Sequence, residues 1–133
     1  MQNNKILWIG SLIVIVFIAW IALSGSTSDS TPSPLDAFAQ CLTDKGLKYY
    51  GAFWCPNCAK QNALFGKSKR FVNYTECSTP DGQGQLQVCK DAKIMNYPTW
   101  EIPAMGEATT SSRLIGTQEL STLSQVSNCQ LPK

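Results

Sequence analysis

Two cysteines separated by two residues offer the clearest chemistry in this sequence, Cys55 and Cys58 in the run Trp54-Cys-Pro-Asn-Cys58. They lie where a strand-like aromatic run ends and a helical segment begins. Free N–H groups and the helix dipole at such a junction stabilise a thiolate on the first cysteine. An exposed Cys55 could attack a disulfide, and Cys58, buried one turn further on, could resolve the mixed disulfide. The alternatives are an inert disulfide or half of a zinc site.

The composition removes several other kinds of chemistry. The 133 residues include no histidine, which excludes Ser-His and Cys-His catalytic pairs and every histidine-containing metal site. Eleven basic side chains nearly balance nine acidic ones, and the formal net charge is +2. This balance gives no support for nucleic acid binding. The length predicts one small domain with an accessory segment.

The accessory segment is the N-terminus. Residues 6–23 form an uncharged apolar stretch, about as long as a helix needs to cross a bilayer. Lys5 precedes the stretch and Asp29 is the first charge after it, so we expect a single-pass signal-anchor with residues 1–5 in the cytoplasm. The rest would lie on the extracytoplasmic side of the cell membrane. A cleaved signal peptide, ending near Ala22-Leu-Ser24, is the alternative, and it would also export the chain.

A polar tether and one domain follow the predicted span. Residues 24–34 are rich in serine, threonine and proline, which predicts a flexible linker. We place the folded domain at residues 35–130 and find no internal repeat. Outside the cytoplasm, an even number of cysteines indicates disulfides more often than metal ligands.

Helix and strand patterns alternate along the domain. Ser33 is expected to cap the first helix, with Pro34 in its first position and Gly46 at its end. Thr117 is expected to cap the last helix. This order predicts an α/β fold with a mixed central sheet of about four strands flanked by helices. The expected elements are a helix at 34–45, a strand at 47–53, a helix at 58–65, a strand at 71–76, a helix at 86–92, strands at 99–102 and 111–115, and a helix after 117.

Several stretches resemble the thioredoxin family. The run Gly51-Ala-Phe-Trp-Cys-Pro-Asn-Cys58 is similar to the thioredoxin active-site turn, and Tyr97-Pro-Thr-Trp100 resembles the segment that carries the family's cis-proline. The similarity is greater still to thioredoxin-like domains that are fused to, or partner, bacterial homologues of vitamin K epoxide reductase. The further stretches that carry it are Lys45-Gly-Leu-Lys-Tyr-Tyr50, Leu64-Phe-Gly66, Tyr74-Thr-Glu-Cys77, Val88-Cys-Lys90 and Glu101.

The resemblance implies a thioredoxin fold in which Pro98 is cis and faces the dithiol. A cis bond there would expose the Tyr97 backbone to pair with a bound peptide. Trp54, Pro56 and Asn57 would complete the rim of the site. The alternative is a trans proline at the start of a strand.

Two departures from the family pattern concern the same site. Tyr49 occupies the position where thioredoxins carry a buried aspartate, so proton transfer to or from Cys58 needs another route. Asn57 stands where this subfamily often has histidine, and it brings no positive charge to the thiolate. The resemblance therefore does not determine how strong an oxidant the protein is.

The remaining four cysteines have more than one interpretation. Cys77 and Cys89 flank a glycine-rich loop, and the resemblance supports their pairing as a second disulfide. That pair would be either a structural staple or an auxiliary redox pair for the active-site dithiol. Cys41 and Cys129 remain for each other as a possible third disulfide, or they are two buried free thiols. Six cysteines allow fifteen pairings, so the sequence alone leaves the connectivity open.

The sequence thus predicts a membrane-anchored thiol–disulfide oxidoreductase that acts on extracytoplasmic protein thiols, with no cofactor and no metal. The resemblance favours oxidative folding, recharged by a quinone-linked membrane reductase similar to vitamin K epoxide reductase. Reduction of apocytochrome thiols or of scrambled disulfides is the alternative direction. A metal-binding module built from Cys55, Cys58, Cys77 and Cys89 is a further alternative, but the spacing of the second pair fits a zinc site badly.

Overall fold

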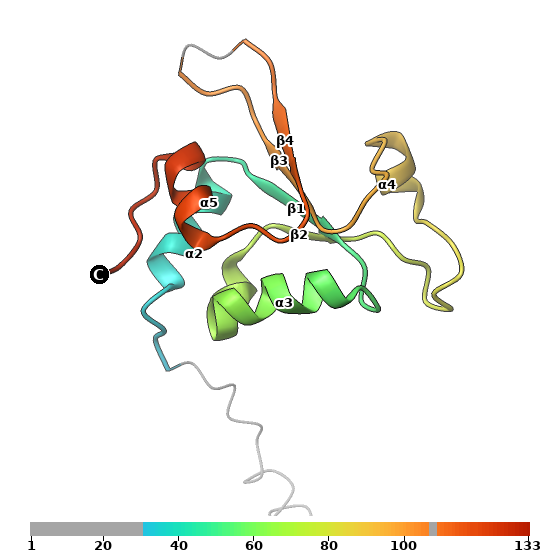
Figure 1. The fold of residues 1–133 in the computed structure, drawn as a ribbon, viewed down its shortest axis with the longest axis horizontal. Coiled ribbons are helices and arrows are strands. Elements are labelled where there is room, and N and C mark those ends of the chain that lie inside the picture. The colour runs from blue at the N-terminus through green and yellow to red at the C-terminus, as the bar shows by residue number, and fades with distance from the viewer. Residues whose placement is uncertain (1–30, 107–108) are drawn as a thin grey trace, which may run out of the picture. The chain divides into compact units, whose positions relative to one another are not determined.

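The computed structural model describes residues 31–106 and 109–133 (Figure 1). The predicted span at residues 6–23 lies outside these ranges, as does most of the predicted linker. Within them, no helix is both long enough and apolar enough to cross a bilayer. The chain divides into two units between Thr31 and Pro32, and the second of these is the domain described below.

The helices and strands follow one another in the order that the sequence predicts, with a 3-10 helix added after the second helix. That addition, η1, continues directly from α3 at Gly66. The elements are α2 (Asp36–Asp44), β1 (Lys48–Gly51), α3 (Pro56–Phe65), η1 (Gly66–Phe71), β2 (Tyr74–Glu76), α4 (Gln87–Asp91), β3 (Thr99–Ile102), β4 (Ser112–Ile115) and α5 (Leu120–Ser127).

The four strands form one mixed sheet in the order β2-β1-β3-β4. Strands β1 and β2 are parallel, whereas β3 is antiparallel to both β1 and β4. This topology, with a helix after β1 and another after β4, is a thioredoxin-like α/β fold. Because β1 and β2 are parallel, they end at the same edge of the sheet, and Gly51 lies opposite Glu76 there.

Aromatic side chains hold α3 against the sheet. Tyr49 and Trp100 are opposite each other in register and stack with ring centroids 4.8 Å apart. Phe65 of α3 lies 5.9 Å from Trp100, and Phe38 of α2 lies 6.2 Å from Phe65. All four side chains are buried, as is Leu123 of α5. Since burying one such side chain contributes about 1.5–3 kcal/mol, this cluster is a main source of the domain's stability.

A second buried cluster contains Tyr50, Ile94, Cys77 and Cys89. Successive side chains of a strand point to opposite faces, so Tyr50 and Tyr49 face different sides of the sheet. A disulfide joins Cys77, just after β2, to Cys89 of α4. The bond therefore closes the loop between β2 and α4 onto the face opposite the aromatic cluster.

A second disulfide links the two ends of the domain. Cys41 of α2 is bonded to Cys129, which follows α5, and their Cα atoms are 5.9 Å apart. This is the pairing that the sequence left open. The bond joins positions 88 residues apart, so it encloses nearly the whole domain.

The first helix begins later than predicted. Ser33 is not its N-cap; the cap position is Leu35, and no side chain bonds there. The Asp36 carboxylate instead accepts the Ser33 N–H at 2.9 Å, together with hydrogen bonds from Ser68 and Arg70 at 2.8 and 2.7 Å. The carboxylate fixes the chain into a turn before the helix, and the prediction of a serine cap is wrong.

The predicted cap of the last helix is also wrong. Helix α5 begins at Leu120 with Glu119 in the cap position. The Thr117 hydroxyl donates instead to the Asn57 carbonyl oxygen at 3.1 Å. A tertiary contact to α3 therefore takes the hydroxyl that a local cap would have used.

The two disulfides should contribute unequally to stability. On the chain-entropy relation, a loop of 88 residues is worth about 4.6 kcal/mol and a loop of 12 residues about 2.8 kcal/mol. Cys41→Ala/Cys129→Ala should therefore lower the free energy of unfolding more than Cys77→Ala/Cys89→Ala does. Urea unfolding of both variants measures the difference, and an equal or reversed order would contradict this prediction.

Candidate active site

The two cysteines that form no disulfide, Cys55 and Cys58, lie at the first turn of α3. Cys55 is the N-cap residue, with extended backbone angles, and Pro56 takes the first helical position. The Cys58 backbone N–H donates to the Cys55 Sγ atom at 3.3 Å. A proline lacks an N–H, and the first helical N–H has no intrahelical partner in any case, so this sequence starts a helix readily here. The first turn therefore directs a backbone donor at the Cys55 sulfur.

Cys55 is less accessible than the sequence predicts, whereas Cys58 is buried as predicted. Cys55 is 6% exposed and Cys58 is 2% exposed. The expectation of an exposed Cys55 is wrong because Ala52 and Tyr97 pack around the pair. The Cys55 thiol donates to the Tyr97 carbonyl oxygen at 3.6 Å, so its sulfur faces that segment of backbone.

Cys58 lies in a strongly desolvated position. Burial raises the pKa of Cys58 to about 12, and its hydrogen bond with Cys55 acts in the same direction. The Tyr49 hydroxyl donates to the Cys58 carbonyl oxygen at 3.3 Å. Burial also raises the pKa of Tyr49 above its usual range. Near neutral pH the Cys58 thiol therefore keeps its proton unless another group takes it.

The segment that faces Cys55 contains the cis peptide bond that the resemblance implies, between Tyr97 and Pro98. Pro98 is fully buried. The Thr99 hydroxyl donates to the Asn96 carbonyl oxygen at 2.7 Å, and the Gly116 N–H donates to the Pro98 carbonyl oxygen at 2.8 Å. Hydrogen bonds on both sides of the bond thus hold the Tyr97 carbonyl beside the dithiol.

Two aromatic side chains form an exposed rim. Trp54 is 52% exposed and Phe53 is 61% exposed, so Phe53 does not continue β1 into the core as predicted. The Trp54 indole N–H donates to the Ser78 hydroxyl oxygen at 2.8 Å, and its ring meets the Tyr97 ring edge-on at 6.0 Å. Asn57 is also exposed, at the start of α3. The rim is therefore open to solvent but fixed in orientation.

Glu76 ties the end of β2 to the active-site turn, a role that no sequence pattern predicted. Its carboxylate accepts from the backbone N–H groups of Ser78 at 2.8 Å and Phe53 at 3.3 Å, and from the Tyr74 hydroxyl at 2.7 Å. The sequence contained one indication that β2 approaches this turn closely, a glycine near the end of the predicted strand. A Cβ on Gly51 would lie 2.8 Å from the ring of Tyr74, the residue whose hydroxyl is bonded to Glu76.

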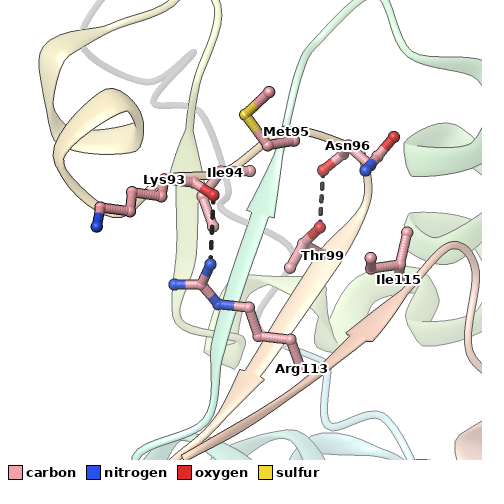
Figure 2. Close-up of a pocket in the computed structure, with 7 residues that line it drawn as sticks. All are labelled: Lys93, Ile94, Met95, Asn96, Thr99, Arg113 and Ile115. Carbon is pink, nitrogen blue, oxygen red and sulfur yellow. Dashed lines mark hydrogen bonds between the residues drawn. The ribbon is translucent and has the colours of Figure 1, made fainter.

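A shallow cavity of about 170 Å³ lies beside the segment that leads to Tyr97. Figure 2 shows its lining by residues 93–96 and by side chains of β3 and β4. Arg113 forms one wall, where it donates to the Ala92 carbonyl at 2.7 Å and to the Glu101 carboxylate at 2.8 Å. Met95 and Ile115 are exposed at its edge. Neither active-site cysteine lines this cavity.

The metal-binding alternative conflicts with the disulfide. Cys77 and Cys89 are bonded to each other, so they are not available as thiolate ligands beside Cys55 and Cys58. Within the two described ranges, no group of three or more histidine, cysteine or acidic residues is placed to hold a metal ion.

Part of the chain is similar in sequence to a thiol-disulfide oxidoreductase. No protein-family model matches the chain. The chain is 42% identical to thiol-disulfide oxidoreductase LTO1 of Arabidopsis thaliana over 81 residues, which cover 57% of this chain and 21% of LTO1. The chain thus spans about a fifth of that relative's length.

Two solved thioredoxin structures align with lower similarity. Mitochondrial thioredoxin 3 of Saccharomyces cerevisiae is 15% identical with a TM-score of 0.39, over 66% of this chain and 82% of that one. Thioredoxin O2 of Arabidopsis thaliana is 18% identical with a TM-score of 0.40, over 72% and 87%. Both scores are low, so the assignment of the fold depends on the topology and register of the sheet. The described domain has a thioredoxin-like fold, and 57% of the chain is similar in sequence to part of a thiol-disulfide oxidoreductase.

Proposed function

We propose that this protein is a thiol–disulfide oxidoreductase whose reacting pair is Cys55 and Cys58. The observation that carries the proposal is the placement of this pair, with Cys55 capping α3 and facing the Tyr97 carbonyl, and with Cys58 one turn deeper. The name of the relative LTO1 supports the same chemistry. Two free thiols at a helix N-terminus can form and break a disulfide without any cofactor.

The proposed direction is oxidation of substrate thiols. A substrate thiolate attacks the Cys55 sulfur of the oxidised pair, the bond between Cys55 and Cys58 breaks, and Cys58 leaves and takes up a proton. A second substrate thiolate then attacks the mixed disulfide and releases Cys55. The substrate gains one disulfide, and the two electrons remain on the reduced cysteine pair.

Proteins are the substrates that the rim fits best. Phe53 and Trp54 are large apolar side chains exposed beside Cys55. Exposed apolar groups gathered around a reactive site favour contact with a polypeptide over contact with a small polar thiol. The Tyr97 carbonyl is placed to accept a backbone N–H from an extended substrate.

The disulfide of Cys77 and Cys89 is better explained as a staple than as a relay. Both residues are 0% exposed, and they pack with Tyr50 and Ile94. Thiol–disulfide exchange needs a thiolate to approach a sulfur in line with the bond, so a fully enclosed disulfide reacts slowly. The bond therefore stabilises the loop that carries Ser78, whose hydroxyl accepts a hydrogen bond from Trp54.

A membrane location and a membrane partner complete the proposal. Residues 6–23 would anchor the domain on the extracytoplasmic side, and a quinone-linked reductase similar to vitamin K epoxide reductase would reoxidise the dithiol. A flexible linker at residues 24–34 would reach roughly 20 Å. Tethering over so short a distance raises the effective concentration of the dithiol at another membrane protein, to about the millimolar range.

The roles of the two cysteines can be tested by alkylation of the reduced protein. Cys55 should react first with iodoacetamide, because the pKa of Cys58 is about 12 and little of its thiolate forms near neutral pH. Cys58 should become reactive as the pH rises toward that value. Peptide mass spectrometry resolves the two sites, and faster modification of Cys58 at neutral pH would reverse the assigned roles.

The partner can be trapped with a variant that lacks the resolving thiol. Cys58→Ala should retain Cys55 and accumulate it in a mixed disulfide, whereas Cys55→Ala should trap nothing. Mass spectrometry of the adduct identifies the class of partner. An adduct with secreted proteins or a quinone reductase agrees with oxidation, and an adduct with apocytochrome-maturation or reductant-exporting proteins would replace it with the reductive direction.

The topology predicts protease sensitivity from outside the cell. Protease added to intact spheroplasts should digest residues 35–130, because the anchor places them beyond the cytoplasmic membrane. A cytoplasmic protein probed in the same sample controls for lysis. Full protection of the domain in intact spheroplasts, with digestion after lysis, would overturn the proposed location.

A further inference from the structure

Each turnover of the proposed exchange moves a proton on or off Cys58, and two phenols face that thiol. Tyr49 comes from β1 and Tyr74 from the parallel neighbour β2. The only carboxylate bonded to either phenol within the described ranges is Glu76. A group that passes protons between the thiol and water must itself reach a proton acceptor.

Tyr49 is badly placed for this task. Its side chain is fully buried, and its hydroxyl donates to the Cys58 carbonyl oxygen at 3.3 Å. Within residues 31–106 and 109–133 that hydroxyl has no carboxylate partner. Tyr49 therefore has no acidic group of its own to pass a proton to, although its ring lies 5.0 Å from that of Tyr74.

Tyr74 has the carboxylate partner that Tyr49 lacks. A Cβ on Gly51 would lie 3.2 Å from the Cys58 sulfur and 3.3 Å from the Tyr74 hydroxyl oxygen, so both groups approach the same side of Gly51. The same hydroxyl donates to the Glu76 carboxylate at 2.7 Å. Glu76 is partly exposed, and hence it can exchange protons with water. A thiol, a hydroxyl and a carboxylate thus form a path from the buried sulfur to the surface.

We propose that Tyr74 and Glu76 form the proton path of Cys58. This inference depends on the proposed function, because only thiol–disulfide exchange requires the path. When Cys55 is in a mixed disulfide, the Cys58 thiol gives its proton to the Tyr74 oxygen while the Tyr74 proton moves to Glu76. The Cys58 thiolate then attacks the Cys55 sulfur and expels the partner thiolate, and Glu76 releases the proton to water. In the oxidising direction the same steps run in reverse.

The surroundings of both groups suit a relay. Burial and the neighbouring Glu76 carboxylate raise the pKa of Tyr74 above its usual range, so the phenol stays protonated and passes a proton on without lasting ionisation. The Lys69 ammonium lies 4.8 Å from the centre of the Tyr74 ring and is attracted to the face of that ring. The Ser78 and Phe53 N–H groups hold the Glu76 carboxylate in position.

A two-phase reaction separates the two cysteines. The full-length reduced protein is mixed with the aromatic disulfide dithionitrobenzoate, which releases one coloured thiolate when Cys55 attacks and a second when Cys58 resolves the adduct. Glu76→Gln keeps the size and the acceptor oxygen of the side chain but binds no proton. We expect an unchanged first phase and a second phase slowed on the order of 100-fold at neutral pH.

Tyr74→Phe should slow the second phase by a similar factor, and the double variant should be no slower than either single one. The second phase of these variants should accelerate as pH rises, because hydroxide then deprotonates Cys58 directly. Glu101→Gln, which removes a carboxylate of β3 paired with Lys48 and Arg113, is the matched control and should leave both phases unchanged.

Several outcomes distinguish this inference from the proposed function. If the native chain shows no second phase, the assignment of Cys58 as resolver fails, and with it the proposed function. If the native chain resolves the adduct and Glu76→Gln does so equally fast at every pH, the proton path is overturned alone. A loss in both phases, or a loss in Tyr49→Phe but not in Tyr74→Phe, would also overturn it.

Discussion

The packing of α3 on the sheet determines where the dithiol lies, and one buried amide contributes much of that fit. Gln61 is fully buried in α3. Its Oε1 atom accepts from the Trp100 indole at 3.1 Å and from the Gln118 N–H at 2.7 Å, while its Nε2 donates to the Gln118 carbonyl at 3.0 Å. Leaving such groups buried without partners would destabilise the domain by about 1–3 kcal/mol each. The helix can therefore slide or rotate only by breaking these bonds.

This fixed helix gives two cysteines of the same turn different surroundings. Cys55 lies at the cap and faces the Tyr97 carbonyl. Cys58 lies over the sheet beside Tyr49, and its thiol is strongly desolvated. The two cysteines differ in how deeply each is buried and not in residue type. This difference makes one thiol suited to attack and leaves the other dependent on a proton acceptor.

The two disulfides stabilise the domain, whereas the exposed aromatic rim is available for contact with other molecules. One disulfide joins the two ends of the domain, and the other closes the loop after β2. Trp54 reaches that loop through Ser78, so the disulfide between Cys77 and Cys89 supports an exposed aromatic side chain indirectly. A small domain buries little apolar surface, so its core alone would hold an exposed rim only weakly. The disulfides add stability that the small core does not supply.

The sequence by itself determined the order of elements, the α/β class and the two cysteines that can react. These features are local, because hydrophobic period, turn residues and C-x-x-C spacing are properties of neighbouring residues. The helix starts at Ser33 and Thr117 were predicted wrongly because Asp36 and the Asn57 carbonyl, rather than local caps, take the hydrogen bonds. Competing partners of this kind are invisible to local rules.

Only the tertiary structure decided the burial of Cys55, the partner of Cys41 and the place of Glu76 beside the active-site turn. Each depends on segments far apart in the chain that the sheet and the helices bring together. The parallel pairing of β1 with β2 is the physical reason for the last of these, because parallel strands end at one edge. Gly51 indicates that something approaches closely, but its identity as Tyr74 follows only from the register of the two strands.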